Sequence, residues 1–279
     1  MNYKAIYLIF SSLLVTSVNA QEKMSICGEL KQGELVVIKN IDATTNSIVL
    51  NEKEYPVTSD GYAILAFHRD EKNNQEILTD NGKYKLDIKA AIWDIQRING
   101  VPQQKVTPDK SNDAEIMRER NDVAKSVNNM EPGDYWREGF IMPVKGRISG
   151  YFGNQRVFNG TPKSPHNGTD IAAPEGTPIK ASGSGKVILN GKDYFYTGNM
   201  VIIDHGQGLQ TMYAHMKDSN VKVGDIVEKG DIIGTVGKTG RVTGPHLHWG
   251  ASLNNIRFRP QSLLDINEKK CQVITGENK

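Results

Sequence analysis

Two histidines separated by one residue, His246 and His248, lie near the end of a glycine-rich segment. If this stretch is a strand, both side chains point to the same side, because strand side chains alternate with a period of two. Upstream, His166 and Asp170 form a His-x-x-x-Asp pattern, and His215 lies between the two motifs. Four of the six histidines therefore fall within three short motifs, and the fold has to bring these motifs together if they serve one site.

The residue types in these motifs are those of a metal site. Three nitrogen or oxygen ligands with one open position characterise a catalytic zinc site, whereas four protein ligands close a structural one. Taken singly, His166 and Asp170 could be a loop pair that caps turns, His215 a half-buried core histidine, and His246 and His248 exposed strand residues. Taken together, their order and spacing favour a metal site.

The segment from 146 to 260 resembles the zinc metallo-endopeptidases of the lysostaphin and LytM type, which cut the peptide part of peptidoglycan. The resemblance rests on the His-x-x-x-Asp pattern, on Tyr-Ala-His-Met at residues 213–216 and on Gly-Pro-His-Leu-His at residues 244–248. It covers less than half of the chain. Each matching position carries the residue that the family uses.

The resemblance implies that His166, Asp170 and His248 ligate one zinc ion and that His215 and His246 are catalytic groups beside it. No His-Glu-x-x-His helix occurs in the sequence, so the glutamate base of other metallopeptidases is missing. Proton transfer then falls to His215 and His246, because histidine titrates near neutral pH. Which of the two is the base stays open.

The resemblance, together with the N-terminal segment described below, implies an exported zinc-dependent endopeptidase that hydrolyses peptide cross-links of bacterial peptidoglycan. The bond that is cut, the oligomeric state and any regulatory protein stay open. The alternative is a non-catalytic relative that binds and activates a cell-wall amidase, although such relatives lose zinc ligands and this chain keeps them. A biotinyl or lipoyl carrier domain is disfavoured, because the sequence has no lysine tripeptide suited to a hairpin tip.

The first twenty residues predict a secretory signal peptide, with Lys4 at a positive start, an apolar run over residues 5–15 and a small-residue cleavage site at residues 18–20. The apolar run is too short for a comfortable membrane span, and no second run follows. We therefore expect export to the periplasm or cell envelope, with a retained N-terminal anchor as the alternative. A net charge of +2 gives no argument for nucleic-acid binding.

Cys27 and Cys271 are the only two cysteines, one near each end of the chain. In an oxidising compartment they could form a disulfide between the N-terminal domain and the C-terminal tail. Sequence separation does not give spatial distance, so pairing and two free thiols are both open.

The pattern as a whole predicts a mainly β protein with a small N-terminal antiparallel β-sandwich or barrel at residues 21–105. Short apolar runs at residues 35–38, 47–50, 63–67 and 84–88 alternate there with turn signals. The zinc peptidase domain, also antiparallel β, is expected at residues 139–263, and residues 264–279 are expected to be a tail.

Residues 106–138 are predicted to form a helical linker. Asn112 and Glu115 have the spacing of a capping box, and one side of the helix is apolar. The apolar positions are Ile116, Val123, Val127 and Met130. We hypothesise that the N-terminal domain, or the helix at residues 113–128, covers the substrate groove. The alternative is a spacer that only sets the distance of the catalytic domain from the wall.

Several residues near the motifs have less specific interpretations. The candidates for groove walls are Tyr194, Tyr196, Asn199 and Arg241. Glycines at residues 237–244 would let backbone approach an extended peptide, or simply form hairpin turns. The two remaining histidines match no motif, and we interpret His68 as a surface residue and His205 as a turn residue.

Overall fold

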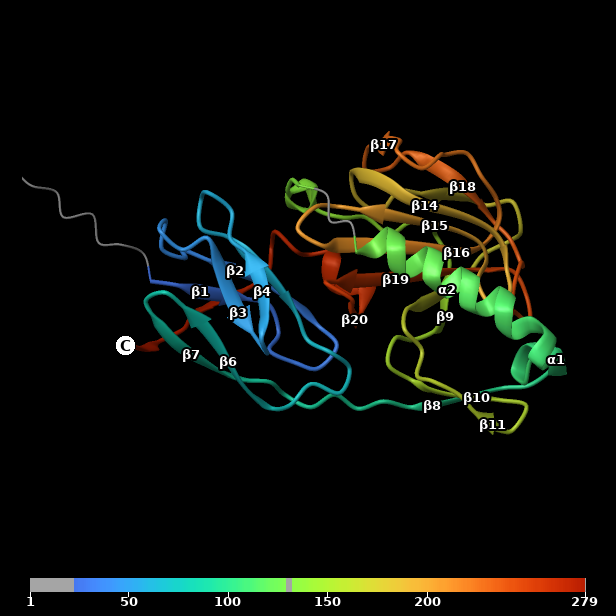
Figure 1. Cartoon of the computed structure of the whole chain (residues 1–279), viewed down its shortest axis with the longest axis horizontal. Coiled ribbons are helices and arrows are strands. Elements are labelled where there is room, and N and C mark those ends of the chain that lie inside the picture. Colours follow the sequence, from blue (N-terminus) through green and yellow to red (C-terminus); the bar gives the residue numbers. More distant parts are fainter. Residues whose placement is uncertain (1–22, 129–131, 279) are drawn as a thin grey trace, which may run out of the picture.

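The computed structural model describes residues 23–128 and 132–278 and consists of two β-rich units, with helix α2 (Asp113–Val127) lying along the second (Figure 1). The predicted signal peptide and Met130 lie outside the described residues. Within the described ranges, no helix is both long and apolar enough to cross a bilayer.

The N-terminal unit consists of two antiparallel sheets that share a core of buried aliphatic side chains. One sheet has the order β21-β1-β2-β5 and the other the order β22-β7-β6-β3-β4. The strands are β1 (Ser25–Cys27), β2 (Leu35–Lys39), β3 (Ser47–Leu50), β4 (Lys53–Pro56), β5 (Ala63–Ala66), β6 (Asn74–Thr79), β7 (Gly82–Asp87), β21 (Cys271–Val273) and β22 (Gly276–Asn278). The four apolar runs of the sequence correspond to β2, β3, β5 and β7, so the prediction of a mainly β chain is confirmed.

The C-terminal residues return to this N-terminal unit, where β21 pairs with β1 and β22 with β7. Cys27 and Cys271 lie directly opposite each other in the β1–β21 pair and form a disulfide. The question that the sequence left open is thereby answered in favour of pairing. The stretch expected to be a tail contributes two strands.

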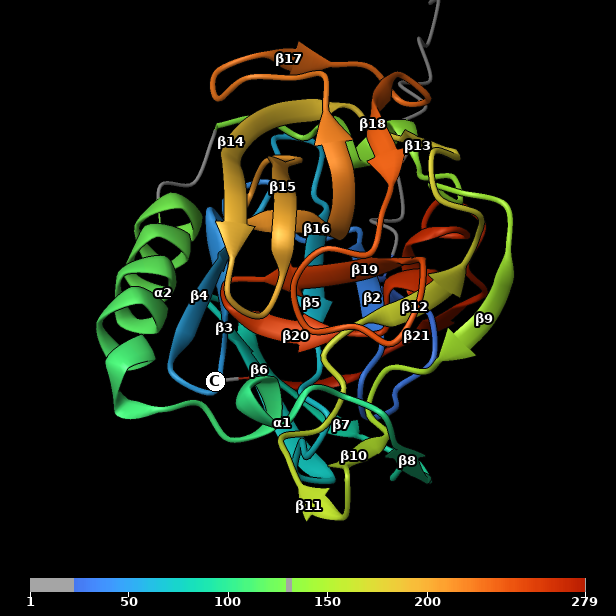
Figure 2. The same ribbon diagram turned by 90° about the vertical axis from the view of Figure 1, so that its right-hand side faces the viewer.

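The second unit is built on a larger antiparallel sheet of order β17-β14-β15-β16-β19-β12-β9 (Figure 2). These strands are β9 (Arg147–Gly150), β12 (Thr169–Ala172), β14 (Gly185–Tyr194), β15 (Gly198–Asp204), β16 (Leu209–Ser219), β17 (Ile226–Val227) and β19 (His246–Leu253). Strands β13 (Pro178–Lys180), β18 (Ile232–Val236) and β20 (Ile256–Phe258) are attached outside this order. The sheet buries a second part of the core, and its strands carry the histidine motifs.

Three further contacts join the two units. Strand β8 (Ile95–Ile98) follows the N-terminal sandwich but pairs in parallel with β10 (Gln155–Phe158), which also pairs with β11 (Thr161–Pro162). The guanidinium of Arg259 donates two hydrogen bonds of 2.7 and 2.8 Å to the carboxylate of Glu34. Arg137 makes a similar pair with Asp60, with two donor–acceptor distances of 2.7 Å.

The predicted helix is present as α2, which lies beside β14 at one side of the sheet (Figure 2). The predicted capping box is wrong, because the side chain of Asn112 caps no backbone N–H. A 3₁₀ turn, η1 (Lys110–Asn112), leads directly into the helix and keeps Asn112 in a helical conformation, whereas a capping residue is extended. The other short helices are α1 (Gln103–Val106), η2 (Tyr135–Glu138) and η3 (Pro260–Leu263).

His205 is not the simple turn residue that we expected, because its side chain is completely buried. Its Nδ1 donates a 2.6 Å hydrogen bond to the carbonyl of Ser184, and its Nε2 lies 2.7 Å from the hydroxyl of Thr211. The ring also packs edge-on against Phe140. Burial lowers the pKa of His205 to about 4.

We therefore expect His205 to make the fold less stable in acid. The unfolded chain binds a proton near the ordinary histidine pKa of about 6.5, whereas the folded chain does so only near 4. The free energy of unfolding should thus fall by about 2–3 kcal/mol on this account between pH 7 and pH 4.5. Urea titrations at both pH values measure this decrease in the free energy of unfolding. In His205→Gln the decrease should be smaller than in the unsubstituted chain by about 2–3 kcal/mol. The exposed His68→Gln control should lose as much as the unsubstituted chain, and equal losses in all three would contradict the prediction.

Candidate metal centre

The register of three neighbouring strands brings the predicted site residues together. Asp170 on β12 lies directly opposite His248 on β19, and His248 lies opposite Ala214 on β16. His166 lies in the loop before β12, four residues ahead of Asp170. All of these side chains except that of Ala214 offer a nitrogen or oxygen atom that could bind a metal ion.

His166, Asp170 and His248 form a compact triangle of donor atoms. The Nε2 atom of His166 lies 3.0 Å from Nδ1 of His248 and 3.1 Å from Oδ1 of Asp170. The third side, from Nδ1 of His248 to Oδ1 of Asp170, measures 2.9 Å. Ligands of a tetrahedral zinc ion with bonds of about 2.0–2.1 Å are about 3.3 Å apart, so this triangle needs only slight expansion to hold one.

The environment of the triangle keeps its lone pairs available. His166 donates Nδ1–H to the carbonyl of Tyr151, 3.1 Å away, which leaves Nε2 unprotonated in the neutral ring. Burial lowers the pKa of His166 to about 4 and also lowers that of His248. Burial alone would raise the pKa of Asp170, but its contacts with His166 and His248 hold it well below its usual range. At neutral pH the donor set is therefore two neutral imidazoles and one carboxylate, which suits zinc.

Two glycines leave room for this arrangement. A Cβ at Gly168 would lie 2.6 Å from Nε2 of His248 and 2.7 Å from the carbonyl oxygen of Trp249. A Cβ at Gly150 would lie 2.6 Å from Oδ2 of Asp170. Larger residues at either position would push the loop or the carboxylate away, so both glycines are required by close packing.

His215 and His246 lie beside the triangle and form a pair, with ring centroids 4.8 Å apart. His215 donates Nδ1–H to the carbonyl of Thr239, and His246 donates Nδ1–H to that of Gly244, each at 2.9 Å. The Nε2 atom of His246 lies 3.8 Å from Oδ1 of Asp170. Burial, together with the nearby His246 and His248, lowers the pKa of His215 well below its usual value.

The backbone of His215 is unusual and explains how its ring reaches the site. Its φ of 64° lies in the left-handed region, which non-glycine residues rarely adopt in a strand. The pairing of β15 with β16 shifts register here, because Asn199 pairs with Met216 but Val201 pairs with Tyr213. This β-bulge redirects the side chain of His215, as bulges near active sites often do.

Arg156 on β10 belongs to the site, although no motif indicated it. Its guanidinium pairs with Oδ2 of Asp170, the carboxylate oxygen that does not face the histidines. A lone arginine on a short strand gives no signal in the sequence, because its partner lies on another strand. The pair fixes the orientation of the Asp170 carboxylate.

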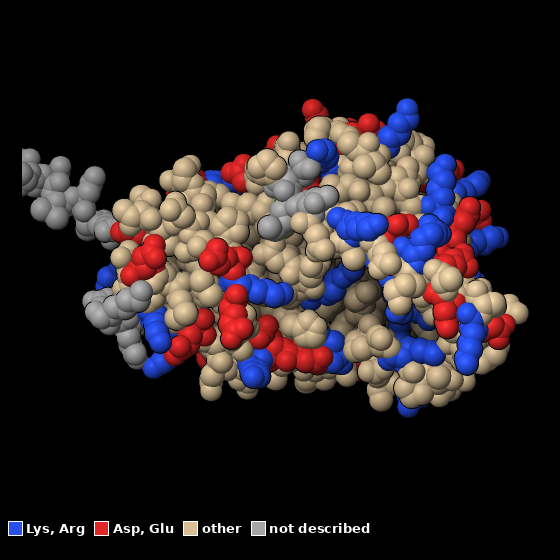
Figure 3. Space-filling model, viewed as in Figure 1, with Lys and Arg blue, Asp and Glu red and all other residues tan. Residues whose placement is uncertain are grey.

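A groove of about 600 Å³ lies over the site, and His166, His215 and His248 form part of its floor. One wall comes from α2, and Tyr194, Tyr196 and Arg241 line it as the sequence suggested. Asn199 is not among the lining residues, since its side chain binds the carbonyl of Lys217 instead. The face seen in Figure 3 is hollowed below α2, with lysine and arginine side chains around the hollow.

The glycines of the 237–244 segment serve mainly the packing of their own chain. A Cβ at Gly237 would lie 2.3 Å from the backbone nitrogen of Lys217, and one at Gly240 would lie 2.5 Å from that of Gly198. Only at Gly244 would a Cβ meet no atom within 4 Å. Close approach of backbone to backbone thus explains Gly237 and Gly240 without a substrate.

Comparison with known families identifies this part of the molecule. Residues 164–260 match the model of peptidase family M23, and the match contains all five site residues that the sequence motifs predicted. The chain contains a peptidase family M23 domain. A solved structure of a Pseudomonas aeruginosa protein assigned to peptidase M23 is 28% identical, with a TM-score of 0.65 over 85% of this chain and 96% of that one. The structural similarity to this protein thus extends beyond the segment that the family model matches.

Curated relatives match over less than half of this chain. The peptidoglycan DD-endopeptidase ShyA of Vibrio cholerae is 44% identical over 124 residues, which are 44% of this chain and 28% of ShyA. The DD-carboxypeptidase/endopeptidase Mpg of Neisseria meningitidis is 45% identical over 98 residues, which are 35% of this chain and 22% of Mpg. The chain therefore spans less than a third of the length of these two relatives.

The triangle predicts a specific pattern of metal loss. If His166, Asp170 and His248 are the ligands of one ion, His166→Ala, Asp170→Asn and His248→Ala should each reduce bound metal from about one ion per chain to below about a tenth. Metal content after dialysis, measured by mass spectrometry, checks this, with circular dichroism as the test of folding. The His68→Ala control should keep its metal. Full metal content in a folded Asp170→Asn variant would show that Asp170 is not a ligand.

Proposed function

We propose that the protein is an exported zinc-dependent endopeptidase that hydrolyses peptide cross-links of bacterial peptidoglycan. The observation that carries this proposal is the triangle of His166, Asp170 and His248 at the floor of a groove, with His215 and His246 beside it. A groove admits an extended peptide, and a three-ligand site leaves a position for water or substrate.

Hydrolysis of an amide requires an activated water, stabilisation of charge on the carbonyl oxygen and a proton for the leaving amine. A zinc ion held by His166, Asp170 and His248 supplies Lewis-acid activation when it is bound. His215 and His246 both have Nδ1 tied to a backbone carbonyl, so Nε2 of each can accept a proton and return it to the leaving amine. The same atoms, once protonated, can donate to a developing oxyanion.

The names of the relatives support a peptidoglycan substrate, since ShyA is a peptidoglycan DD-endopeptidase. The alternative, a non-catalytic activator of an amidase, is not favoured, because all the ligand and proton-transfer positions keep their residues. The Cys27–Cys271 disulfide supports export, because disulfides persist in oxidising compartments such as the periplasm.

The paired histidines should separate turnover from metal binding. We expect His215→Ala and His246→Ala to keep one metal ion per chain but to lose about 10²–10⁴-fold in kcat, the range for removal of a proton-transfer or charge-stabilising group. Release of new peptide ends from purified sacculi, followed by mass analysis of the muropeptides, measures the activity and identifies the bond cut. Metal loss equal to that of His248→Ala would place either histidine among the ligands instead.

We further propose that α2 limits access to the groove, as hypothesised from the sequence. Its side chains Ile116, Glu119, Arg120 and Val123 line one wall. Two contacts support a closed position: the Glu119 carboxylate accepts a 2.9 Å hydrogen bond from the backbone N–H of Phe195, and Val123 packs against a buried cluster that includes Met200. In the described residues, no α2 side chain bonds to the metal triangle.

Val123→Asp should loosen α2, because it removes buried apolar surface and places a charge against the sheet. If α2 restricts access, kcat/KM on soluble muropeptides should rise roughly tenfold at equal metal content, the effect of about 1–2 kcal/mol of lost burial. The matched control is Ala124→Asp, which adds the same charge at an exposed neighbouring position. If kcat/KM of Val123→Asp is no higher than that of Ala124→Asp, α2 does not restrict access, and the interpretation as a spacer holds.

A further inference from the structure

Arg257 lines the groove, but no contact within the described part of the fold accounts for an arginine at this position. It lies on β20 opposite Ser252 of β19, between Ile256 and Phe258. Phe258 is fully buried in the core, so the alternation of the strand directs Arg257 to the opposite face. That face carries His248 and Gly250 on the neighbouring strand β19, and both His248 and Arg257 line the groove.

The guanidinium of Arg257 lacks an acidic or hydrogen-bonding partner within the described residues. Two other partly buried arginines nearby are paired, Arg156 with Asp170 and Arg259 with Glu34. Burial lowers the pKa of Arg257, and no neighbouring charge offsets this effect. A partly buried cation without a partner is costly to the fold, so its presence indicates an anionic partner that the chain itself does not provide.

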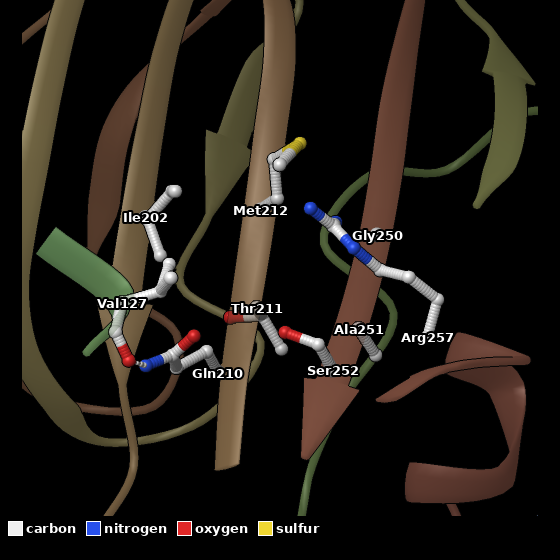
Figure 4. Close-up of a pocket in the computed structure, with 9 residues that line it drawn as sticks. All are labelled: Val127, Ile202, Gln210, Thr211, Met212, Gly250, Ala251, Ser252 and Arg257. Atoms are coloured by element: carbon white, nitrogen blue, oxygen red, sulfur yellow. Dashed lines mark hydrogen bonds between the residues drawn. The ribbon is translucent and has the colours of Figure 1, made fainter. Parts of the chain in front are cut away.

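Gly250 lies next to the guanidinium of Arg257. A Cβ at Gly250 would lie 3.7 Å from Nη1 of Arg257 and 3.4 Å from Cβ of Met212. Figure 4 shows the guanidinium beside Gly250 and directed toward Met212. Since Gly250 follows His248 by two residues on the same strand, these positions are about 7 Å apart. An extended peptide bound over the triangle would therefore bring a group one or two residues from the scissile bond next to Arg257.

The charge of the groove also favours an anionic ligand. Arg120 and Lys163 line it with Arg257, and in the part of the chain that the structure describes neither has an ion-pair partner. The one acidic side chain among the lining residues, Glu119, is engaged by the backbone N–H of Phe195. A peptide that carries free carboxylates fits this balance.

We propose that Arg257 binds a free carboxylate of the substrate peptide, close to the scissile bond, and so selects peptides that carry one. This proposal rests on the proposed endopeptidase function and adds to it the recognition of the substrate. A planar guanidinium can hold a carboxylate through two parallel hydrogen bonds, which fixes both position and orientation.

The test uses two cross-linked muropeptides that differ only in whether the carboxylate nearest the scissile amide is free or amidated. The unsubstituted full chain should cleave the free acid about 10–100-fold better in kcat/KM, as expected for a charged bidentate pair. Arg257→Gln should remove this preference by raising KM for the free acid, with little change for the amide. Arg257→Lys should keep part of the preference. Arg97→Gln, an exposed arginine on β8, is the control for a lost surface charge and should behave as the unsubstituted chain.

A second variant tests the same contact without removing Arg257. Gly250→Asp places a carboxylate beside the guanidinium, where the added Cβ finds ordinary contact distances, and should abolish the preference by competing with the substrate. Gly250→Ala fills the same space without charge and should retain it. Equal cleavage of the free acid and the amide by the unsubstituted chain would overturn the proposal.

Direct binding separates failure of this proposal from failure of the proposed function. If neither muropeptide is cleaved, the endopeptidase function is wrong, and calorimetry with the same two peptides still tests Arg257. Tighter binding of the free acid that is lost in Arg257→Gln would support the contact. Equal binding of both peptides would overturn it.

Discussion

The site depends on the register with which β19 pairs between β12 and β16. Along β19, His246, His248 and Gly250 lie on one face, of which His248 lines the groove, whereas Leu247 and Trp249 alternate with them and are completely buried in the core. The same register sets Asp170 opposite His248. If β19 slipped by one residue against its neighbours, its two faces would exchange and the imidazoles would lie in the core. Burial of Leu247 and Trp249 therefore both stabilises the fold and aligns the donor atoms of the site.

The rings of the site are held by backbone carbonyls from two loops, the one after β9 and the one between β18 and β19. Tyr151, Thr239 and Gly244 accept the Nδ1–H of His166, His215 and His246, respectively. Each bond fixes both the tautomer and the rotation of its ring, so Nε2 points toward the site before any ligand binds. The left-handed backbone of His215 stores strain of the order of 1–2 kcal/mol, which the surrounding sheet sustains. Preorganisation of this kind is what a metal and a proton-transfer pair require.

The sequence predicted those features that depend on local pattern. Alternating apolar runs predicted β2, β3, β5 and β7, helical periodicity predicted α2, and the histidine spacing predicted a shared site. Features that depend on distant partners were missed. Arg156 acquires its role only from Asp170 on another strand. Strand β8 leaves the N-terminal sheets to pair with β10. The C-terminal stretch forms β21 and β22 only because β1 and β7 offer free edges. The capping box failed because η1 precedes α2 without an extended residue.

The path of the chain constrains how access to the groove can change. The chain leaves the N-terminal unit through β8 and returns to it as β21 and β22, where the disulfide between Cys27 and Cys271 links β1 to β21. Helix α2 is fixed to the second unit in its middle and at its C-terminal end, since Glu119 binds the N–H of Phe195 and Gln210 donates to the carbonyl of Val127 (Figure 4). A shift of the N-terminal unit therefore leaves the wall of the groove in place. Opening this wall requires α2 itself to separate from β14 and β16, against the burial of Val123 and Val127.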